Sequence, residues 1–126
     1  MMLQILVICT GACIGALARW ALGMWLNPGN LLPWGTLAVN LIGGYLIGVC
    51  VAVFQAMPEL SPLWRLALVT GFLGTLTTFS SFSAEVVGMF LNERYGLGLA
   101  TIGMHLLGSL TMTFIGIKSA AFLISR

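Results

Sequence analysis

Charged side chains interrupt this hydrophobic chain at only a few positions, and the intervals between them are long. No Asp, Glu, Lys or Arg occurs in residues 1–18, 20–58, 66–84 or 95–117. One membrane crossing takes about 20 predominantly apolar residues, so the longest interval holds one full helix together with a loop or part of another helix. The pattern predicts several membrane-spanning helices.

Turn-forming and polar residues divide the chain. The boundaries are Asn27-Pro28-Gly29-Asn30 followed by Pro33, then residues 57–62 with Pro58 and Pro62, then residues 92–96. We therefore expect four transmembrane helices over residues 3–25, 33–56, 62–91 and 97–123, which form a single domain over residues 1–126. Because no Lys or Arg precedes Arg19, the first segment is predicted to be a retained helix and not a cleaved signal peptide.

Composition strengthens the membrane interpretation and excludes other classes. Charged residues make up 6% of the 126 residues, hydrophobic residues make up 60%, and the mean hydropathy is +1.08. Soluble domains carry about 25% charged residues, so this chain has too little polar surface to be a soluble enzyme. The net charge of +2 includes no basic cluster, which excludes a nucleic-acid binder. Cys9, Cys13 and Cys50 have no neighbouring His or acid and are interpreted as packing residues.

Basic residues are nearly balanced across the predicted bundle. Arg65, Lys118 and Arg126 lie toward the side with both termini, and Arg19 and Arg94 lie toward the other side. Two arrangements fit this weak bias. Either the chain inserts in both orientations and forms an antiparallel dimer, or one orientation is set by the insertion machinery or a partner.

Small and polar residues recur at helical spacing. Gly11 and Gly15, and Gly44 and Gly48, are pairs that let helices approach closely in lipid. Two polar stripes fall on one helix face each: Thr36 and Asn40 continue to Gly44 and Gly48, and Thr101, His105, Ser109 and Thr113 repeat the spacing. His105 fits either a packing role or a ligand or proton-carrying role.

The third predicted helix has an unusual composition. Seven of the fourteen residues in 70–83 are Ser or Thr, and Gly71 and Gly74 weaken the helix near its middle. One alternative is a break whose freed carbonyls bind a small cation such as Na⁺. The other is a continuous helix whose hydroxyls bond to the preceding turn.

Aromatic and acidic side chains follow this segment. Phe79 and Phe82 share a helix face, and their positive ring edges favour an anion in a dry passage, although most such pairs only pack. Ser80, Ser81 and Ser83 place hydroxyl donors along the same stretch. Glu85 has Arg19 and His105 as alternative partners.

These residues resemble a known family. The segments 15–20 (GALARW), 35–48 (GTLAVNLIGGYLIG) and 71–85 (GFLGTLTTFSSFSAE) closely resemble the signatures of the Fluc (CrcB-type) fluoride channels. The resemblance covers the whole four-helix chain. Thr75 stands where members often have Gly, and Ser81 stands where many have Thr; each keeps a small residue or a hydroxyl.

The resemblance implies an all-α bacterial inner-membrane protein whose third helix is broken near its middle. It implies an antiparallel, dual-topology homodimer that passes fluoride out of the cytoplasm and holds one structural Na⁺ at its centre. The implied Na⁺ ligands are the backbone carbonyls of Gly74 and Thr77. The implied pore residues are Asn40, Phe79 and Phe82, with Ser80, Ser81 and Ser83 nearby; Arg19, Glu85 and His105 are candidate supporting groups.

Two rival classes are weaker. A small multidrug or cation exporter also has four helices and dual topology, but its proton coupling needs a carboxylate in the first helix, and residues 3–25 contain none. A non-transporting assembly subunit would explain the glycine pairs but not the Ser, Thr and Phe constellation.

Overall fold

Four long helical spans make up the chain in the computed structural model, which describes residues 1–27, 29 and 32–126. The spans are α1 (Met2–Leu26), α2 (Trp34–Ala56), a composite third span (Pro62–Leu91) and α6 (Tyr95–Ile124). The third span comprises α3 (Pro62–Arg65), η1 (Leu66–Leu73), α4 (Gly74–Leu76) and α5 (Phe79–Leu91). Each span is long and apolar enough to cross a bilayer. The predicted all-α, four-helix membrane architecture is confirmed; Pro28 and Asn30 of the first predicted turn lie outside the described residues.

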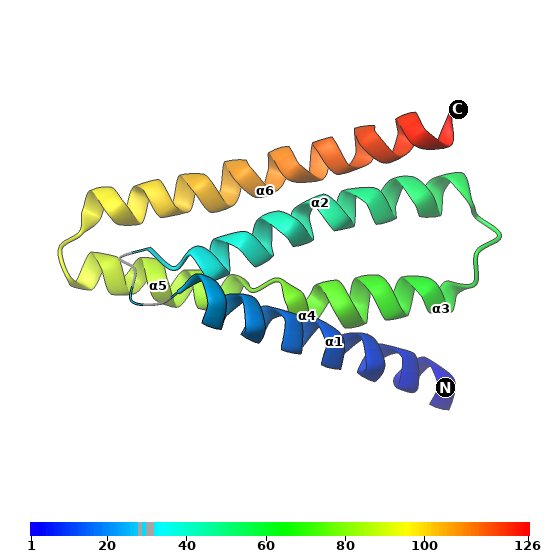
Figure 1. The fold of residues 1–126 in the computed structure, drawn as a ribbon, viewed down its shortest axis with the longest axis horizontal. Coiled ribbons are helices and arrows are strands. Elements are labelled where there is room, and N and C mark those ends of the chain that lie inside the picture. The colour runs from blue at the N-terminus through cyan, green and yellow to red at the C-terminus, as the bar shows by residue number, and fades with distance from the viewer. Residues whose placement is uncertain (28, 30–31) are drawn as a thin grey trace.

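The spans pack as two pairs along the length of the molecule. α2 lies along α6, and α1 lies along η1 and α4, with both termini at one end of the bundle (Figure 1). Glycines allow these close approaches: a Cβ at Gly48 would collide with the carbonyl oxygen of Thr113, and one at Gly11 would collide with that of Ala67. Both predicted glycine pairs therefore lie at helix–helix contacts.

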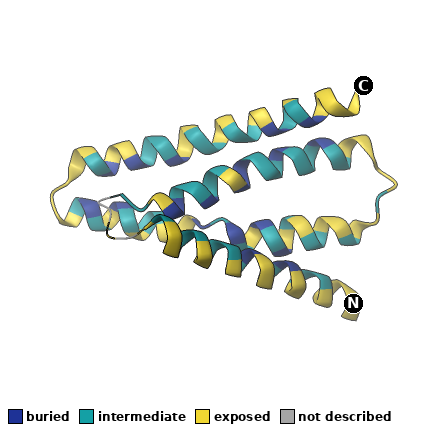
Figure 2. Ribbon diagram, in the orientation of Figure 1, coloured by how far each residue is buried: buried dark blue, intermediate teal, exposed yellow. Residues whose placement is uncertain are grey.

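Apolar side chains cover the outside of the bundle, and a small hydrophobic cluster is buried inside it. Val39, Leu73 and Leu76 form that cluster, with Cys50 packed against it. Exposed residues line the outer faces of all four spans (Figure 2). Because lipid and not water can solvate such a surface, the chain is a multi-pass membrane protein. Cys50 is partly buried as predicted, whereas Cys9 and Cys13 are exposed and so do not pack within a single chain.

The third span is interrupted after Leu76. The backbone of Thr77 (φ −79°, ψ 155°) and that of Thr78 (φ −149°, ψ 113°) are extended, and α5 begins at Phe79. The predicted break is confirmed, but it does not fall at the glycines. Gly71 lies inside the π-helical segment η1, where it packs against α1, and Gly74 is the first residue of α4.

Candidate ion site at the helix break

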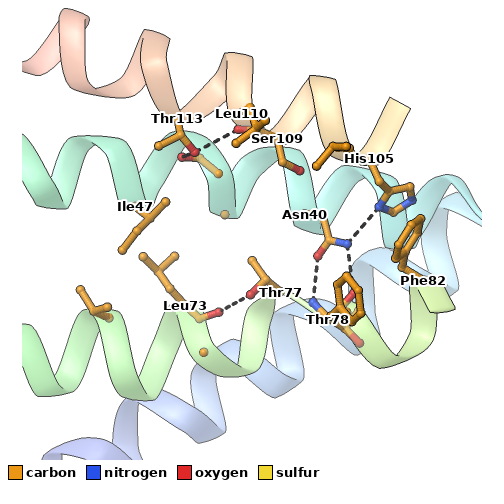
Figure 3. A pocket seen from close by; sticks show the side chains of 16 residues that line it. Asn40, Ile47, Leu73, Thr77, Thr78, Phe82, His105, Ser109, Leu110 and Thr113 are labelled. Carbon is orange, nitrogen blue, oxygen red and sulfur yellow. Dashed lines mark hydrogen bonds between the residues drawn. The ribbon is translucent and has the colours of Figure 1, made fainter. Parts of the chain in front are cut away.

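The extended backbone at Thr78 is held by a side chain from another span. The Thr78 N–H donates to Asn40 Oδ1 at 2.8 Å, and Asn40 Nδ2 donates to the Thr78 carbonyl at 3.0 Å. Figure 3 shows this pair of bonds between α2 and the break. Since backbone polar groups in a membrane interior must be satisfied by protein, the Asn40 amide replaces the helical partners that Thr78 lacks.

The same rearrangement frees two carbonyl groups. In a continuous helix the Thr78 N–H would donate to the carbonyl of Gly74, but it donates to Asn40 instead. The Ser81 N–H would donate to the carbonyl of Thr77, but it donates to Thr78 Oγ1 at 3.2 Å. Gly74 and Thr77 thus each present a carbonyl oxygen that has lost its helical donor, and both residues line the adjacent cavity.

That cavity has a volume of about 500 Å³ and lies between the break, α2 and α6. Asn40, Thr77, Thr78, Phe82 and His105 gather toward one end, and Ile47, Leu73 and Leu110 line the rest (Figure 3). No Asp or Glu belongs to its lining in the described part of the chain. The cavity is therefore mostly apolar, with a polar end and with no carboxylate from the described residues.

Phe79 and Phe82 both line the cavity and contact one another. Their ring centroids are 5.5 Å apart at an interplanar angle of 60°, an edge-to-face arrangement that directs the positive edge of one ring at the other. Phe82 also lies against the imidazole of His105, with centroids 4.5 Å apart. Phe79 is 79% exposed, so a single chain leaves most of this ring uncovered.

The polar stripe of α6 is divided between the cavity and the core. His105, Ser109 and Thr113 line the cavity, whereas Thr101 is buried and donates to the carbonyl of Leu97. Thr113 donates to the carbonyls of Gly44 and Ser109, so its hydroxyl proton is committed to backbone. The Ser109 hydroxyl has no hydrogen bond among the described residues. Ser109 and Thr113 were not predicted as site residues, although their four-residue spacing from His105 was the available signal.

The three serines after the break do not line the cavity. Ser81 Oγ accepts from Thr78 Oγ1 at 3.0 Å, and Ser80 Oγ lies 3.4 Å from the same oxygen. Ser83 donates to the carbonyl of Phe79 at 2.9 Å. These hydroxyls therefore organise the first turn of α5.

Glu85 is paired with neither residue suggested for it. Its Oε1 accepts from Thr36 Oγ1 at 2.5 Å, and its Oε2 is buried with no hydrogen-bonding partner among the described residues. Glu85 borders a second hollow, of about 320 Å³, together with Arg94. Arg19 is half-buried in α1 and, within the described ranges, forms no ion pair with Glu85.

Side chains offer no obvious centre for a transition metal. The described residues contain no group of three or more His, Cys, Asp or Glu close enough to share an ion. Any cation at the break would rely on the carbonyl oxygens of Gly74 and Thr77, which are hard ligands of the kind that unwound membrane helices use for Na⁺.

Comparison with known proteins identifies relatives over the full chain. The relative named "Fluoride-specific ion channel FluC" in Albidiferax ferrireducens is 70% identical over 125 residues, which is 99% of this chain and 96% of that protein. The protein of the same name in Paracidovorax citrulli is 60% identical over 126 residues and 100% of both chains. That in Variovorax paradoxus is 62% identical over 119 residues, covering 94% and 95% of the two chains.

The family described as "CrcB-like protein, Camphor Resistance (CrcB)" matches residues 6–117, which include all four spans and the break. With this match and full-length relatives of such high identity, the chain belongs to the CrcB-like family of membrane proteins.

Proposed function

We propose that this chain is a passive, fluoride-selective channel that exports fluoride across the bacterial inner membrane. The cavity at the helix break carries the proposal, since ring edges and polar hydrogens converge there without a carboxylate. The relatives named as fluoride-specific ion channels supply the identity of the ion.

The chemistry of the cavity suits a small anion. Fluoride is strongly hydrated, so a pore that takes it from water has to provide closely placed donors. The Ser109 hydroxyl is such a donor, and the edge-to-face pair of Phe79 and Phe82 adds positive ring edges. Glu85 lies against Thr36 and outside the cavity lining, so its carboxyl group does not border the proposed path.

We further propose that the working unit is an antiparallel, dual-topology homodimer. Phe79 and Gly74 line the cavity yet are exposed in one chain, which supports a second copy closing its open side. The near-even distribution of Lys and Arg supports insertion in both orientations. A two-fold axis near the break would bring the same carbonyls together from both subunits.

That arrangement fits one structural Na⁺ at the dimer centre. The carbonyls of Gly74 and Thr77 have lost their helical donors, and two copies of each form an all-oxygen set suited to a hard monovalent cation. The ion would supply positive charge that holds the two broken spans together. Gly74 and Thr77 would hold it, Asn40 keeps the backbone open, and the phenylalanines exclude water.

Fluoride efflux from liposomes tests the proposed function. Purified protein in vesicles loaded with fluoride should release it passively, as recorded by a fluoride electrode, and should discriminate strongly against chloride. Equal flux of the two halides, or no flux from a correctly assembled protein, would contradict the channel. Protein-free vesicles give the background leak.

A further inference from the structure

The backbone of Thr78 determines which way the Asn40 amide faces. A backbone N–H can only donate, so the Asn40 atom 2.8 Å from it is the oxygen; a carbonyl can only accept, so the atom 3.0 Å from it is the nitrogen. Of the two hydrogens on Nδ2, one is directed to Thr78 and the other to His105 Nδ1, at 3.1 Å. Both amide hydrogens are therefore used within the protein.

The same bond determines the protonation state of His105. An amide NH₂ group has no acceptor to offer, so Nδ1 of the imidazole accepts the hydrogen and carries none of its own. The ring is then neutral, with its proton on Nε2. Nε2 has no hydrogen-bonding partner among the described residues, and the ring is held against Phe82 with only 5% of the residue exposed.

We propose that Asn40 is a positioning residue: it holds the broken backbone open at Thr78 and fixes His105 as the Nε2–H tautomer. This deepens the proposed function, on which it rests for the identity of the anion, by giving the polar end of the cavity one fixed arrangement of hydrogens. An anion that bound the Asn40 amide would first have to break its bond to Thr78 or to His105.

Nitrogen-15 NMR tests the tautomer directly, because the chain contains a single histidine and the labelled spectrum has one imidazole. In the full-length protein in lipid bilayers, we expect Nδ1 to give a pyridine-type signal and Nε2 to give a protonated, pyrrole-type signal. A proton on Nδ1 in the unmodified protein would overturn the proposal without any variant.

Asn40→Asp tests whether this bond controls the tautomer. The carboxylate still accepts from the Thr78 N–H, but it offers His105 only an acceptor, so the proton should appear on Nδ1. Gln55→Glu makes the same amide-to-carboxylate change at an exposed position of α2 and should leave the Nε2–H signal in place. If His105 in Asn40→Asp still carries its proton only on Nε2, Asn40 does not control the tautomer. If that variant does not fold, the spectrum of the unmodified protein decides.

Sodium fluoride titration tests whether Asn40 keeps this arrangement when the anion is present, with sodium chloride at equal ionic strength as the control. The His105 proton should stay on Nε2 in both salts. A move of that proton to Nδ1 in fluoride would overturn the proposal. If the protein shows the Nε2–H tautomer but passes no fluoride in liposomes, the proposed function is contradicted. The role of Asn40 is then still supported.

Discussion

Asn40 and Thr78 are 38 positions apart in sequence, yet the side-chain amide of the first forms hydrogen bonds with both the N–H and the carbonyl of the second. This pairing resembles one rung of a β-ladder inside a helical bundle. It explains how two residues of extended backbone persist in a membrane span, because each polar group of Thr78 that leaves the helix gains a partner on α2.

Asn40→Ala should therefore destabilise the fold. The change leaves the buried N–H and carbonyl of Thr78 without their partners, and each unsatisfied group costs about 1–3 kcal/mol. The measurement is the free energy of unfolding in mixed micelles of lipid-like detergent and SDS. Gln55→Ala on the same helix is exposed and should change stability little. Equal losses from the two variants would show that the Asn40–Thr78 hydrogen bonds contribute nothing to stability.

The four spans could be predicted from the sequence because they depend on local composition. Charge-free intervals of sufficient length bounded by prolines and charged residues indicate membrane helices wherever they occur. The Ser and Thr content of residues 70–83 left a break and a continuous helix as alternatives, and the family resemblance favoured the break, but neither gave its position. Its position at Thr77–Thr78 depends on Asn40, a contact between distant segments that no local pattern reveals.

The sequence indicated which types of residue form the site. It did not indicate which of these residues bond to each other. Asn40, Phe79 and Phe82 line one cavity, whereas Ser80, Ser81 and Ser83 cap or bond within α5. Thr36 and Asn40 share a helix face, yet one binds Glu85 and the other binds Thr78 and His105. Which polar group pairs with which depends on how the spans are rotated against each other, and periodicity within one span does not determine that rotation.

Replacing either cavity phenylalanine by Ile should reduce fluoride flux while the dimer still forms. Phe→Ile keeps most of the bulk, removes the positive ring edge and breaks the edge-to-face pair of Phe79 and Phe82, and such an aromatic pair is worth about 0.5–1.5 kcal/mol. At about 1.4 kcal/mol per tenfold in rate, flux through Phe79→Ile or Phe82→Ile should fall roughly two- to tenfold. The measurement is electrode-recorded efflux per folded dimer.

Phe72→Ile and Phe90→Ile are the matched controls for this comparison. Phe72 packs against the buried cluster and Phe90 contacts Tyr95, so neither ring borders the cavity. Their substitution should act through stability and not through flux per folded dimer. If Phe72→Ile and Phe82→Ile reduce normalised flux equally, Phe82 has no pore role, and the same comparison applies to Phe79.

Gly96→Cys should reveal the orientation of the chain. A Cβ at Gly96 meets nothing within 4 Å, and the residue is exposed, so the substitution fits without altering any of the five basic residues. In a background lacking Cys9, Cys13 and Cys50, an impermeant maleimide should label one fraction of the protein in sealed cells and the remainder only after permeabilisation. Labelling wholly from one side would refute dual topology.

Removal of Na⁺ should weaken the proposed dimer. A cation that binds only the assembled state stabilises it in proportion to the logarithm of its concentration above the dissociation constant. Exchange into N-methylglucamine salts should therefore raise the dissociation of the dimer measured by cross-linking and should lower fluoride flux. Since the proposed ligands are carbonyls, Thr77→Ser should retain the Na⁺ dependence. Dimer stability that is independent of Na⁺ after verified removal would count against the site.

Thr36→Val should destabilise the fold through Glu85. Thr36 Oγ1 is the only described donor to this carboxyl group, whose other oxygen is already buried without a partner. Removing the hydroxyl while keeping the side-chain shape leaves a buried polar group unpaired, at a cost of about 1–3 kcal/mol. Thr10→Val is the control, because the exposed Thr10 hydroxyl bonds only to the carbonyl of Leu6.

Adding Glu85→Leu to Thr36→Val should recover stability, since replacing both partners by apolar groups is nearly neutral. Strictly additive losses in this double-mutant cycle would mean that the two residues do not stabilise one another.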